Sequence, residues 1–360
     1  FFNLSFATTN AVNTLPLKEE VFFSYLPLCH IAERLLVQMG SLYCGGRVFF
    51  AESLETFSDN LSEAAPTIFL GVPRIWTKFQ SGILAKINQN KLNILLSIPF
   101  ISTLVKRKIK KGLGLTRTKN TFTGAAPTPV ALINWFSKLD INIQEAYAMT
   151  ENTCYSHVTF NHNIRIGYVG QALPKCQVKL SRNNEILIKH DALMNGYYKM
   201  PDETSKTIID GWLHTGDEGY IDNEGFLKIT GRVKDLFKTS KGKYVAPSPI
   251  EMKLSENQYI EQVCLVGSGI PQPIAIVVLS EKTKMNLDQI IKNSLNKILE
   301  KVNKNLDSHE KINNIVVVQD QWTVENKLLT PTMKIKRKEI ENLYKENYND
   351  WYVKDKVLIV

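Results

Sequence analysis

Cysteine is scarce in this sequence, and its placement excludes two common kinds of site. The five cysteines are odd in number, widely separated and without a CxxC spacing: Cys29, Cys44, Cys154, Cys176 and Cys264. The sequence therefore predicts neither a zinc site nor a disulfide framework. Reduced, mostly buried thiols fit a cytoplasmic protein best, because disulfides are rare in that compartment.

Long apolar runs are missing as well. No stretch reaches the roughly 18 to 20 apolar residues that a bilayer-spanning helix needs. The opening residues, FFNLSFATTN, have neither the charged start nor the cleavage site of a signal peptide. We therefore expect a protein that is neither secreted nor membrane-spanning. Phe1 lies inside a stretch that reads as a helix running toward Asn10, so we interpret the chain as a fragment.

A glycine-rich phosphate loop is the third absence. Close glycine pairs occur at 45–46, 112–114 and 267–269. None of the three has the spacing or the Lys-Ser/Thr ending of a phosphate-binding loop. We interpret them as helix caps and strand turns.

Composition sets only broad limits. The chain has 360 residues, 44% of them hydrophobic, and a formal net charge of +9. This length allows two domains and a large core. Positive charge attracts nucleic acid, anionic lipid or polyphosphate ligands without selecting among them. Lysines on solvated helix faces explain the excess equally well, and we expect no nucleic-acid partner.

Short apolar strands alternate with helical stretches, which predicts a layered α/β domain. Apolar runs indicate buried strands at 21–28, 47–50, 67–70 and 141–146, and periodicity indicates helices at 31–43, 74–86 and 129–139. From 167 to 187 the pattern changes to strands with polar turns, including a hairpin in QVKLSRNNEILI. We expect a β-rich subdomain there.

Beyond Arg232 the pattern predicts a small α+β domain. A strand and a helix come first, followed by strands at 261–266 and 274–279, a long helix at 287–305 and a strand at 314–319. We therefore divide the chain into 1–165, the layered core, 166–231, the β-rich subdomain, and 232–360, the small C-terminal domain.

The segment GWLHTGDEGYIDNEGFLKITGRVKD, residues 211–235, carries an acidic turn and a basic turn around one hairpin. Gly216 allows a tight turn that leaves the Asp217 carboxylate at a strand end, where it could accept hydrogen bonds from both ribose hydroxyls. The turn at 222–225 then joins two short strands. Arg232 follows, where its guanidinium could reach the same sugar or a phosphate. We interpret the segment as two halves of a nucleotide site.

Four separated segments together resemble the adenylate-forming superfamily, specifically the long-chain fatty acid CoA ligases. They are FTGAAPTP (122–129), IQEAYAMTE (143–151), the block from T-G-D to G-R-V-K-D, and LLTPTMKIKR (328–337). LPLCHIAERL (26–35) and PTIFLGVPRIWTKF (66–79) resemble the long-chain subgroup in particular. The resemblance extends over essentially the whole chain. It implies part of a large α/β adenylation domain with a β-rich subdomain, followed by a mobile C-terminal lid.

The resemblance also implies a reaction: ATP-dependent, AMP-forming ligation of a long-chain fatty acid to coenzyme A through an acyl adenylate. A carboxylate must then attack the α-phosphorus of an anion, so the site needs cations. Lys334, which follows 330–333, matches the lysine that bridges substrate carboxylate and α-phosphate. Its neighbours Lys336, Arg337 and Lys338 are expected to be solvated surface charges.

The resemblance also implies site residues in the segments 143–151 and 122–129. Glu151 matches the Mg²⁺ ligand, in keeping with the preference of that ion for carboxylate oxygen. Thr150 would donate its hydroxyl to the α-phosphate, and Tyr147 would lay its ring on adenine. The backbone of four small residues would approach the base edge: Gly124, Ala125, Ala126 and Pro127. Ala146 and Ala148 stand where the family more often has glycine, which leaves the preferred acyl length open.

The thioester step requires a different surface. Lys234, in the turn 233–235, matches the position about which the lid rotates. Rotation would withdraw Lys334 and bring in 238–247, where Gly242 leaves room for the pantetheine arm. Lys241 and Lys243 either meet the phosphates of coenzyme A or are plain loop charges. His30 either borders the acyl carbonyl or is a packed histidine with one hydrogen bond.

Two alternatives remain beside the ligase. The family's phosphate loop, rich in Ser, Thr and Gly and ending in Lys, would precede the first residue here, so we expect these 360 residues to be inactive alone. A ligase that loads a carrier protein, or one that activates an aryl acid, would share the same motifs. A non-catalytic remnant or regulatory nucleotide binder would fit the missing loop.

One basic segment is independent of these motifs. Residues 96–115 join an apolar stretch to five basic residues: Lys106, Arg107, Lys108, Lys110 and Lys111. The segment could rest on an anionic leaflet and receive fatty acid from it, which would place the protein at the inner face of a membrane. Alternatively, it is an amphipathic helix with its basic side in water.

Overall fold

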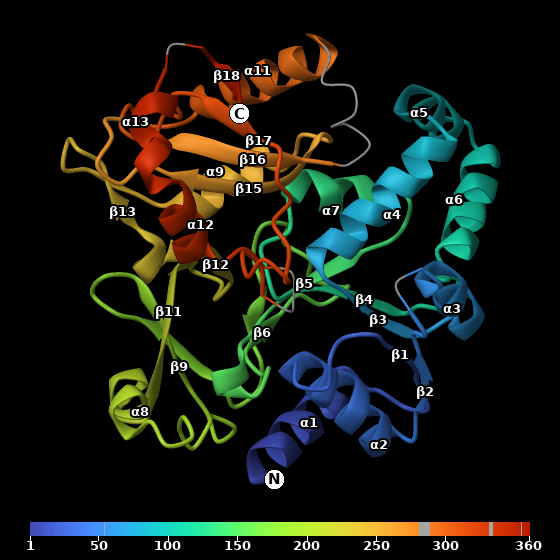
Figure 1. Ribbon diagram of the computed structural model, residues 1–360. Helices are drawn as coiled ribbons and strands as arrows, with labels where there is room; N and C mark the ends of the chain where they lie inside the picture. The colour runs from blue at the N-terminus through green and yellow to red at the C-terminus, as the bar shows by residue number, and fades with distance from the viewer. Residues whose placement is uncertain (54, 281–288, 331–333, 354) are drawn as a thin grey trace. The chain divides into compact units, whose positions relative to one another are not determined.

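The computed structural model describes residues 1–53, 55–280, 289–330, 334–353 and 355–360. These residues form two compact units (Figure 1). Unit 1 comprises 1–215 and 219–229, and unit 2 comprises 216–218 and 230–360. Residues 216–218 fall inside the predicted β-rich subdomain, yet most of their contacts are with unit 2.

Unit 1 is built on a seven-stranded sheet with the order β2-β1-β3-β4-β5-β6-β7. Its strands are β1 (Val21–Ser24), β2 (Arg47–Phe50), β3 (Ile68–Gly71), β4 (Asn120–Thr123), β5 (Ile143–Tyr147), β6 (His157–Val158) and β7 (Gln171–Ala172). The pairs from β2 to β5 are parallel, whereas β6 pairs antiparallel with both β5 and β7. The layered α/β architecture expected from the sequence is confirmed.

Both faces of this sheet are covered, and the continuous runs of apolar residues along its strands explain why. On β1, Phe22 and Phe23 belong to two different cores, and Ile68 and Phe69 on β3 do the same. Neighbouring residues of a strand point to opposite faces, so continuous apolar strands bury both sides. Helices close each face: α1 (Phe2–Thr14), η1 (Glu33–Met39), α2 (Gly40–Cys44), α3 (Phe57–Ala64), α4 (Pro73–Lys86) and α7 (Val130–Ser137).

The prediction of a buried strand at 47–50 is correct in position and wrong in burial. β2 pairs with β1 and is the last strand in the order of the sheet. Phe50 is 70% exposed and Phe49 38%. An edge strand keeps one side in solvent, so the apolar run signalled a strand without signalling its depth.

The segment 96–115, treated above as one piece, belongs to two helices, α5 (Gln89–Ser97) and α6 (Ile101–Gly112). Residues 98–100 separate them, with Phe100 at a φ of +66°. A bulky residue rarely adopts this backbone region, so a single helix cannot continue through it. Lys106 also forms an ion pair with Asp140 at 2.9 Å, which removes it from the group of solvated cations.

A second sheet has the order β10-β11-β9-β8, with β12 paired to β11. Its strands are β8 (Gln177–Leu180), β9 (Glu185–Lys189), β10 (Ile208–Ile209), β11 (Trp212–Ile221) and β12 (Leu227–Arg232); helix α8 (Pro201–Thr207) precedes β10. The β8–β9 hairpin predicted from QVKLSRNNEILI is confirmed. Asp217 was predicted at a strand end and instead lies within the ten residues of β11, where Gly216 has a φ of +69°.

Unit 2 is built on a four-stranded sheet with the order β15-β16-β17-β18. The strands are β15 (Ile260–Val266), β16 (Ile274–Leu279), β17 (Ile315–Val318) and β18 (Val357–Ile359), and a separate hairpin pairs β13 (Phe237–Lys238) with β14 (Tyr244–Val245). The first pair is antiparallel and the other two are parallel. The strand predicted at 274–279 coincides with β16.

Every residue of β16 is buried, because helices cover both faces of the sheet. α9 (Pro247–Leu254) and α11 (Gln289–Asn303) contribute to the core on one face. α12 (Arg337–Tyr344) and α13 (Tyr348–Trp351) contribute to the other, around Trp322. The described part of the predicted helix 287–305 is α11. The small α+β organisation is therefore confirmed, although α12, α13 and β18 were not foreseen.

Candidate active site

The first half of the candidate site lies at the carboxyl ends of β4 and β5 in unit 1. These strands are parallel neighbours with Thr123 beside Glu145. The segment 124–127 follows β4 directly, and 148–151 follows β5. Parallel strands carry their carboxyl ends to one edge of a sheet, which is where open α/β sheets bind ligands. Two motifs that are 20 residues apart in sequence are therefore adjacent at a place suited to binding.

The backbone of 124–127 fits closely against β5. A Cβ atom added to Gly124 would lie 3.0 Å from the carbonyl oxygen of Ala146, tighter than most contacts of that kind. Ala125 has a φ of +68°, a region that few residues other than glycine adopt. Small side chains are thus needed here by the geometry itself, and Ala126 and Pro127 are exposed.

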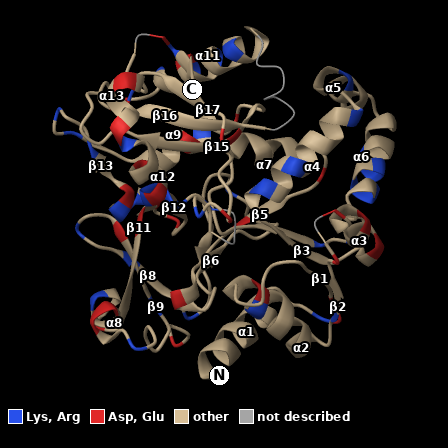
Figure 2. Ribbon diagram, viewed as in Figure 1, with Lys and Arg blue, Asp and Glu red and all other residues tan. Residues whose placement is uncertain are grey.

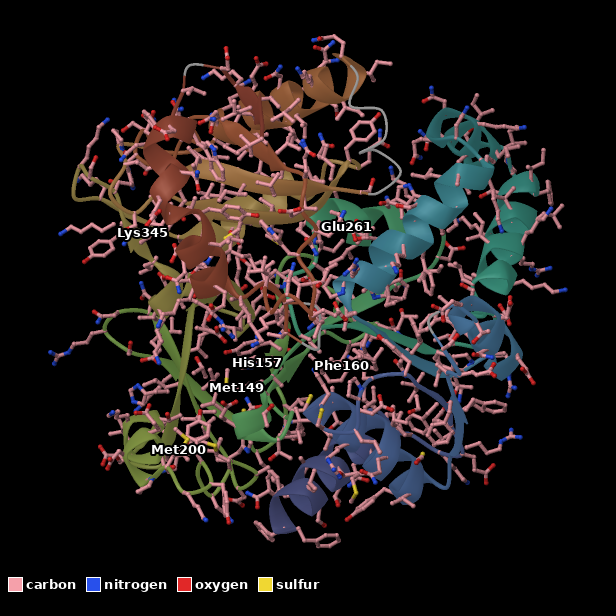
Figure 3. All side chains as sticks on the ribbon, in the orientation of Figure 1. Met149, His157, Phe160, Met200, Glu261 and Lys345 are labelled. Carbon is pink, nitrogen blue, oxygen red and sulfur yellow. The ribbon has the colours of Figure 1, made fainter. Side chains whose placement is uncertain are left out.

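Tyr147 ends β5 and is half-buried at the edge of the core formed by Ile186, Ile188, Leu213 and Leu227. Its ring centroid lies 6.1 Å from that of His157, which faces it across the β5–β6 pair. Figure 3 labels His157 and, near it, Met149, which borders the same core. One face of a base could rest on the Tyr147 ring while the other side of the ring packs on protein.

Thr150 and Glu151 form a short 3-10 helix, Thr150–Asn152, directly after this strand. Thr150 is exposed. One carboxylate oxygen of Glu151, Oε1, accepts a hydrogen bond from the Tyr197 hydroxyl at 2.8 Å. Burial and Glu151 both raise the pKa of Tyr197, so its hydroxyl remains a donor. Tyr197, which the sequence did not single out, holds the carboxylate in place.

The surroundings of Glu151 show whether its carboxylate could bind Mg²⁺. Among the described residues, no group of three or more His, Cys, Asp or Glu side chains is placed to hold a metal ion. Magnesium in nucleotide sites is commonly held by one or two carboxylates together with substrate phosphates and waters. A single, oriented Glu151 carboxylate therefore fits an ion that arrives with a nucleotide.

His30 lies at the start of the helical segment that follows β1. Its Nδ1 accepts a hydrogen bond from the Ala32 backbone N–H, and its carbonyl oxygen accepts from Glu33 and Arg34. These bonds cap the helix start, a structural role. β1 is separated from β4 by β3 in the sheet. A role of His30 at the acyl carbonyl stays a prediction.

Two buried groups near this half were missed from the sequence. Burial raises the pKa of Glu145 to about 7, although its carboxylate accepts a hydrogen bond from the Gly167 N–H at 3.0 Å. Burial lowers the pKa of His157 to about 3, so its imidazole is neutral at physiological pH. Their only sequence signal was their nearness to Tyr147, since both occupy ordinary strand positions.

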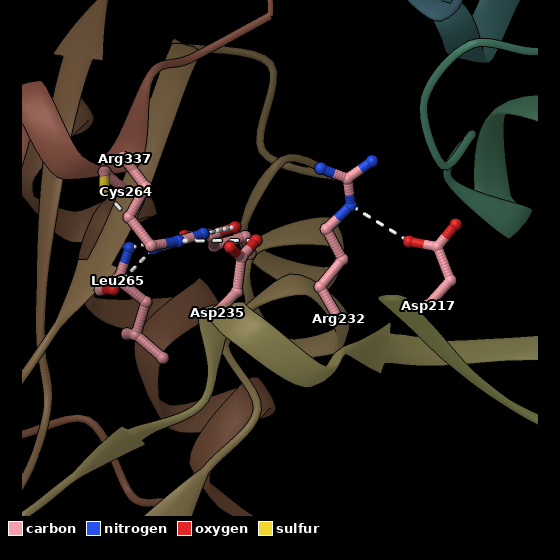
Figure 4. Close-up of polar contacts among 7 residues, drawn as sticks. Asp217, Arg232, Asp235, Cys264, Leu265 and Arg337 are labelled. Atoms are coloured by element: carbon pink, nitrogen blue, oxygen red, sulfur yellow. Dashed lines mark hydrogen bonds and ion pairs between the residues drawn. The ribbon is translucent and has the colours of Figure 1, made fainter. Parts of the chain in front are cut away.

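The second half of the candidate site lies in unit 2 and is made of charged side chains (Figure 4). The Arg232 Nε donates a hydrogen bond to the Asp217 Oδ1 at 2.9 Å. The side chain of Asp217 is 8% exposed and that of Arg232 is 59% exposed. A mostly buried carboxylate is thus paired with a cation that solvent, or a ligand, can still reach.

Lys334 is the third charged residue in this part of the site. Its backbone N–H donates to the Thr330 hydroxyl at 3.1 Å, and Leu329 and Ile335 form an antiparallel bridge. These contacts pair Thr330 with Lys334 and Leu329 with Ile335. Pro331 and the two residues after it, which precede Lys334 in the fourth motif, lie outside the described residues.

The Lys334 ammonium lies within range of electrostatic interaction with both Arg232 and Asp217. Although much of the residue is exposed, crowding of the ammonium by protein atoms lowers its pKa. The positive charge of Arg232 lowers the pKa further, and Asp217 acts in the opposite direction. The structure therefore brings Asp217, Arg232 and Lys334 together, two cations around one carboxylate, although more than 100 residues of sequence separate Lys334 from Arg232.

Arg337 corrects the sequence analysis, which assigned it to the solvated surface. Its side chain is 11% exposed. The guanidinium donates to both oxygens of Glu251, at 2.7 and 2.8 Å, and to the Leu265 carbonyl at 2.8 Å. Burial alone would lower the pKa of Arg337, but the Glu251 charge raises it. Bidentate pairing makes the charge tolerable inside the protein, a context that a KIKRK sequence does not reveal.

Arg337 also reaches the predicted hinge. Its Nε lies 3.8 Å from an oxygen of Asp235, the last residue of the 3-10 helix Val233–Asp235 (Figure 4). Lys334 lies only three residues before Arg337 in the chain. One buried guanidinium thus ties the loop that carries Lys334 to α9, to β15 and to the turn that contains Lys234. Lys234 itself is exposed.

Lys241, Gly242 and Lys243 form the exposed tip of the β13–β14 hairpin. The Gly242 N–H donates to the Thr239 carbonyl at 2.9 Å, and Gly242 has a φ of +77°. A glycine is therefore required by this turn whether or not a ligand binds. The tip does not take part in the Asp217, Arg232 and Lys334 cluster. A role in coenzyme A binding stays a prediction.

Two family models match this chain. Residues 2–198 match the AMP-binding enzyme family, and residues 234–356 match the AMP-binding enzyme C-terminal domain. The two matched segments leave out most of the second sheet. They contain Tyr147 and Glu151 in the first match and Lys334 in the second.

Relatives of known function are similar across nearly the whole chain. Long-chain-fatty-acid–CoA ligase 5 of Rattus norvegicus is 32% identical over 94% of this chain and 56% of its own length. Long-chain-fatty-acid–CoA ligase 6 of Homo sapiens is 30% identical over 94% of this chain and 55% of its own length. The chain thus spans about half the length of the curated relatives it matches.

Solved structures share the fold. The A-PCP didomain of a carboxylic acid reductase from Segniliparus rugosus, solved with AMP, has a TM-score of 0.76 at 23% identity over 98% of this chain and 51% of that one. The o-succinylbenzoate CoA synthetase of Bacillus subtilis, solved with its acyl-adenylate intermediate, has a TM-score of 0.72 at 19% identity over 95% and 65%. At these identities the likeness supports the fold alone.

Proposed function

Since this chain belongs to the AMP-binding enzyme family, we propose that the protein activates a long-chain fatty acid with ATP and passes the acyl group to coenzyme A. The carboxylate attacks the α-phosphorus, pyrophosphate leaves, and an acyl adenylate remains. The thiol of coenzyme A then attacks the acyl carbonyl, and AMP leaves. The choice of a long-chain acid rests on the similarity to ligases 5 and 6.

The observation that carries the proposal is the cluster of Asp217, Arg232 and Lys334. Asp217 has a second oxygen besides the one bound to Arg232, and a carboxylate can accept bonds from a ribose diol. Lys334 would face the α-phosphate and the incoming fatty carboxylate. Its positive charge would stabilise negative charge as it moves from one to the other, the usual source of a large catalytic effect.

The residues of unit 1 would bind the other parts of the nucleotide. Tyr147 would pack on adenine, the backbone after Gly124 would meet the base edge, and Thr150 would donate to the α-phosphate. Glu151, oriented by Tyr197, would hold Mg²⁺, which when bound neutralises part of the phosphate charge. These roles are proposed from the family resemblance, and the placement of the residues at the ends of β4 and β5 supports them.

The second step would use the exposed β13–β14 hairpin. Rotation about Lys234 would withdraw Lys334 and present Gly242 to the pantetheine arm, with Lys241 near its phosphates. A few loop residues can absorb such a change. The expected inactivity of these 360 residues alone belongs to the same proposal, because none of their glycine pairs forms a phosphate loop.

Pyrophosphate release by the full-length protein, measured across fatty acids of increasing length, tests the proposal. We expect release with long-chain acids and, after coenzyme A is added, a long-chain acyl-CoA detected by mass spectrometry. If a thioester forms on a carrier protein but not on free coenzyme A, the acyl acceptor is the carrier protein. If pyrophosphate is released with aryl acids only, the substrate is an aryl acid and not a fatty acid. If no acid leads to release, the protein is a non-catalytic nucleotide binder.

A further inference from the structure

Helices α5 and α6 form a hairpin on unit 1 whose inner side is anchored and whose outer side is not covered by the described residues. Leu92 of α5 is buried in the core beneath α4 and α7. From α6, Val105 and Ile109 pack against the same core. No residue of α6 is fully buried. One side of each helix thus packs against the core, and the opposite side is free to contact another molecule.

The tip of this hairpin is apolar and exposed. Residues 97–101 are all exposed, and Phe100 is 87% exposed. Leu104, one turn further along α6, is 66% exposed, and Ile94 on α5 is 61% exposed. Single exposed apolar residues are ordinary, but a group on adjoining turns marks an interaction surface.

Basic residues follow the apolar tip along the outer side of α6. Arg107, Lys108 and Lys111 are exposed, whereas Lys106 and Lys110 are only partly so. Lys108 lies four residues after Leu104, so the two share one face of the helix. The outer side therefore changes from apolar to basic within about two turns. Figure 2 shows Lys and Arg on α6 and no Asp or Glu.

The charge of the surrounding sequence is one-sided. Between Glu63 and Asp140 there is no Asp or Glu at all, while there are twelve Lys and Arg. This one stretch carries more positive charge than the +9 of the whole chain, so the remainder is net acidic. The basicity of the protein is therefore a property of this region and not an even coating of lysines.

We propose that the α5–α6 hairpin is a docking surface for an anionic lipid membrane. Phe100 and Leu104 enter the interface between headgroups and acyl chains, and Arg107, Lys108 and Lys111 meet the lipid phosphates. Apolar insertion and electrostatic attraction together are what hold an interfacial helix. The proposal does not rest on ligase activity, so either can fail without the other.

The apolar tip and its charge favour a membrane over other partners. Nucleic acid would be attracted by the cations, but Phe100, Ile101 and Leu104 would then remain exposed to water. A second copy of this chain, docked hairpin to hairpin, would bring two basic clusters together, which is unfavourable. Only a lipid surface offers an apolar layer directly beneath a layer of negative charge.

Vesicle flotation tests the proposal with the full chain. We expect the protein to float with vesicles that contain about a third phosphatidylglycerol and to float weakly with pure phosphatidylcholine. Replacing Arg107, Lys108 and Lys111 by Gln should lower partitioning to anionic vesicles roughly 100-fold, at about 1 kcal/mol per cation. Phe100→Ser and Leu104→Ser should each lower it roughly tenfold or more.

Matched variants on other surfaces control for general effects. Lys297, Lys304 and Lys311 are exposed in unit 2, and replacing all three by Gln should leave flotation unchanged. Leu42→Ser, at a position 73% exposed on α2, should also leave it unchanged. Thermal unfolding of each variant shows that the fold persists.

Four results would overturn the proposal. The first is no flotation of the unchanged protein with anionic vesicles. The second is flotation that survives both the charge and the tip substitutions. The third is a lipid-free dimer that Phe100→Ser converts to monomer while flotation is unaffected, which would assign the surface to a second copy. Binding to an RNA or DNA duplex in place of vesicles would likewise refute it.

Discussion

In unit 1 the candidate site consists of backbone and small side chains, whereas in unit 2 it consists of charged side chains. Around Gly124 the backbone approaches within a tight contact of Ala146, and Ala125 takes a backbone conformation that most residues avoid. Around Asp217 the arrangement depends on ion pairs and on repulsion between cations. Close contacts define the region in unit 1, whereas charge defines the region in unit 2.

This difference predicts that the two halves respond to different substitutions. Removing a charge should affect unit 2 strongly, while adding volume should affect unit 1.

Arg337→Met should lower the free energy of unfolding by about 3 to 5 kcal/mol, because it leaves the Glu251 carboxylate buried without its cation. Denaturant titration measures this change. Lys338→Met, at the exposed neighbouring position, should change stability little. Adding Glu251→Leu to the first variant should restore part of the loss. A first variant as stable as the unchanged protein would mean that Arg337 does not anchor the loop.

Lys334→Ala in the full-length protein should slow adenylate formation by 10²- to 10³-fold, about 3 to 4 kcal/mol, since one stabilising charge is lost. Thioester formation from supplied acyl adenylate should persist. Lys338→Ala serves as the control. Equal loss of both steps would contradict the role of Lys334, because coenzyme A transfer would then need the same amine.

Glu145→Gln should change how stability depends on pH. An unfolded carboxyl titrates near its ordinary value of 4.5, whereas burial raises the pKa of Glu145 to about 7. Between these values the folded protein keeps a proton that the unfolded chain releases, so stability falls as pH rises through the window. The full difference is on the order of 3 kcal/mol. The Gln variant, which keeps an acceptor for Gly167, should not show this decline in unfolding experiments from pH 4.5 to 7.

Asp217→Ala should weaken ATP binding by about 1.5 to 3 kcal/mol for each charge-assisted hydrogen bond to the ribose that is lost. Calorimetry with the full-length protein measures the affinity. Glu218→Gln is the matched control, because neighbouring strand residues point to opposite faces. Unchanged affinity in the Ala variant would remove Asp217 from the ribose.

Gly124→Ala should have the smallest effect, about 1 kcal/mol, because the neighbouring carbonyl must move by a few tenths of an ångström to admit a methyl group. We expect weaker AMP binding with little change in global stability. Gly82→Ala, where an added Cβ meets nothing within 4 Å, is the control. Stronger binding in the Gly124 variant would show that the close approach serves packing and not the nucleotide.

The turn at 222–225 could be predicted from the sequence because it depends on a local pattern of turn-forming residues. Gly242 and the small residues after β4 were instead assigned from the family resemblance. Runs of apolar residues likewise indicated several strands, and the prediction at 274–279 matched β16 to the residue. Burial was less accessible: the Phe-Phe pair of β2 reads as core and lies at an edge.

Long-range partners could not be read in this way. Nothing near Arg337 in sequence names Glu251 as its partner 86 residues earlier, and nothing in the strand pattern shows that Tyr197 would orient Glu151. The sequence pattern likewise did not show that residues 96–115 divide between α5 and α6, or that Phe100 and Leu104 are exposed.

From the sequence alone we could predict the fold class, many of the helices and strands, the order of the motifs and the family resemblance, because these depend on side-chain pattern and backbone preference over a few residues. The tertiary structure decided which cations are buried and paired, which stay solvated, and which apolar residues lack cover. The free-energy cost of a charged or exposed apolar group depends on how far its neighbours in space shield it from water.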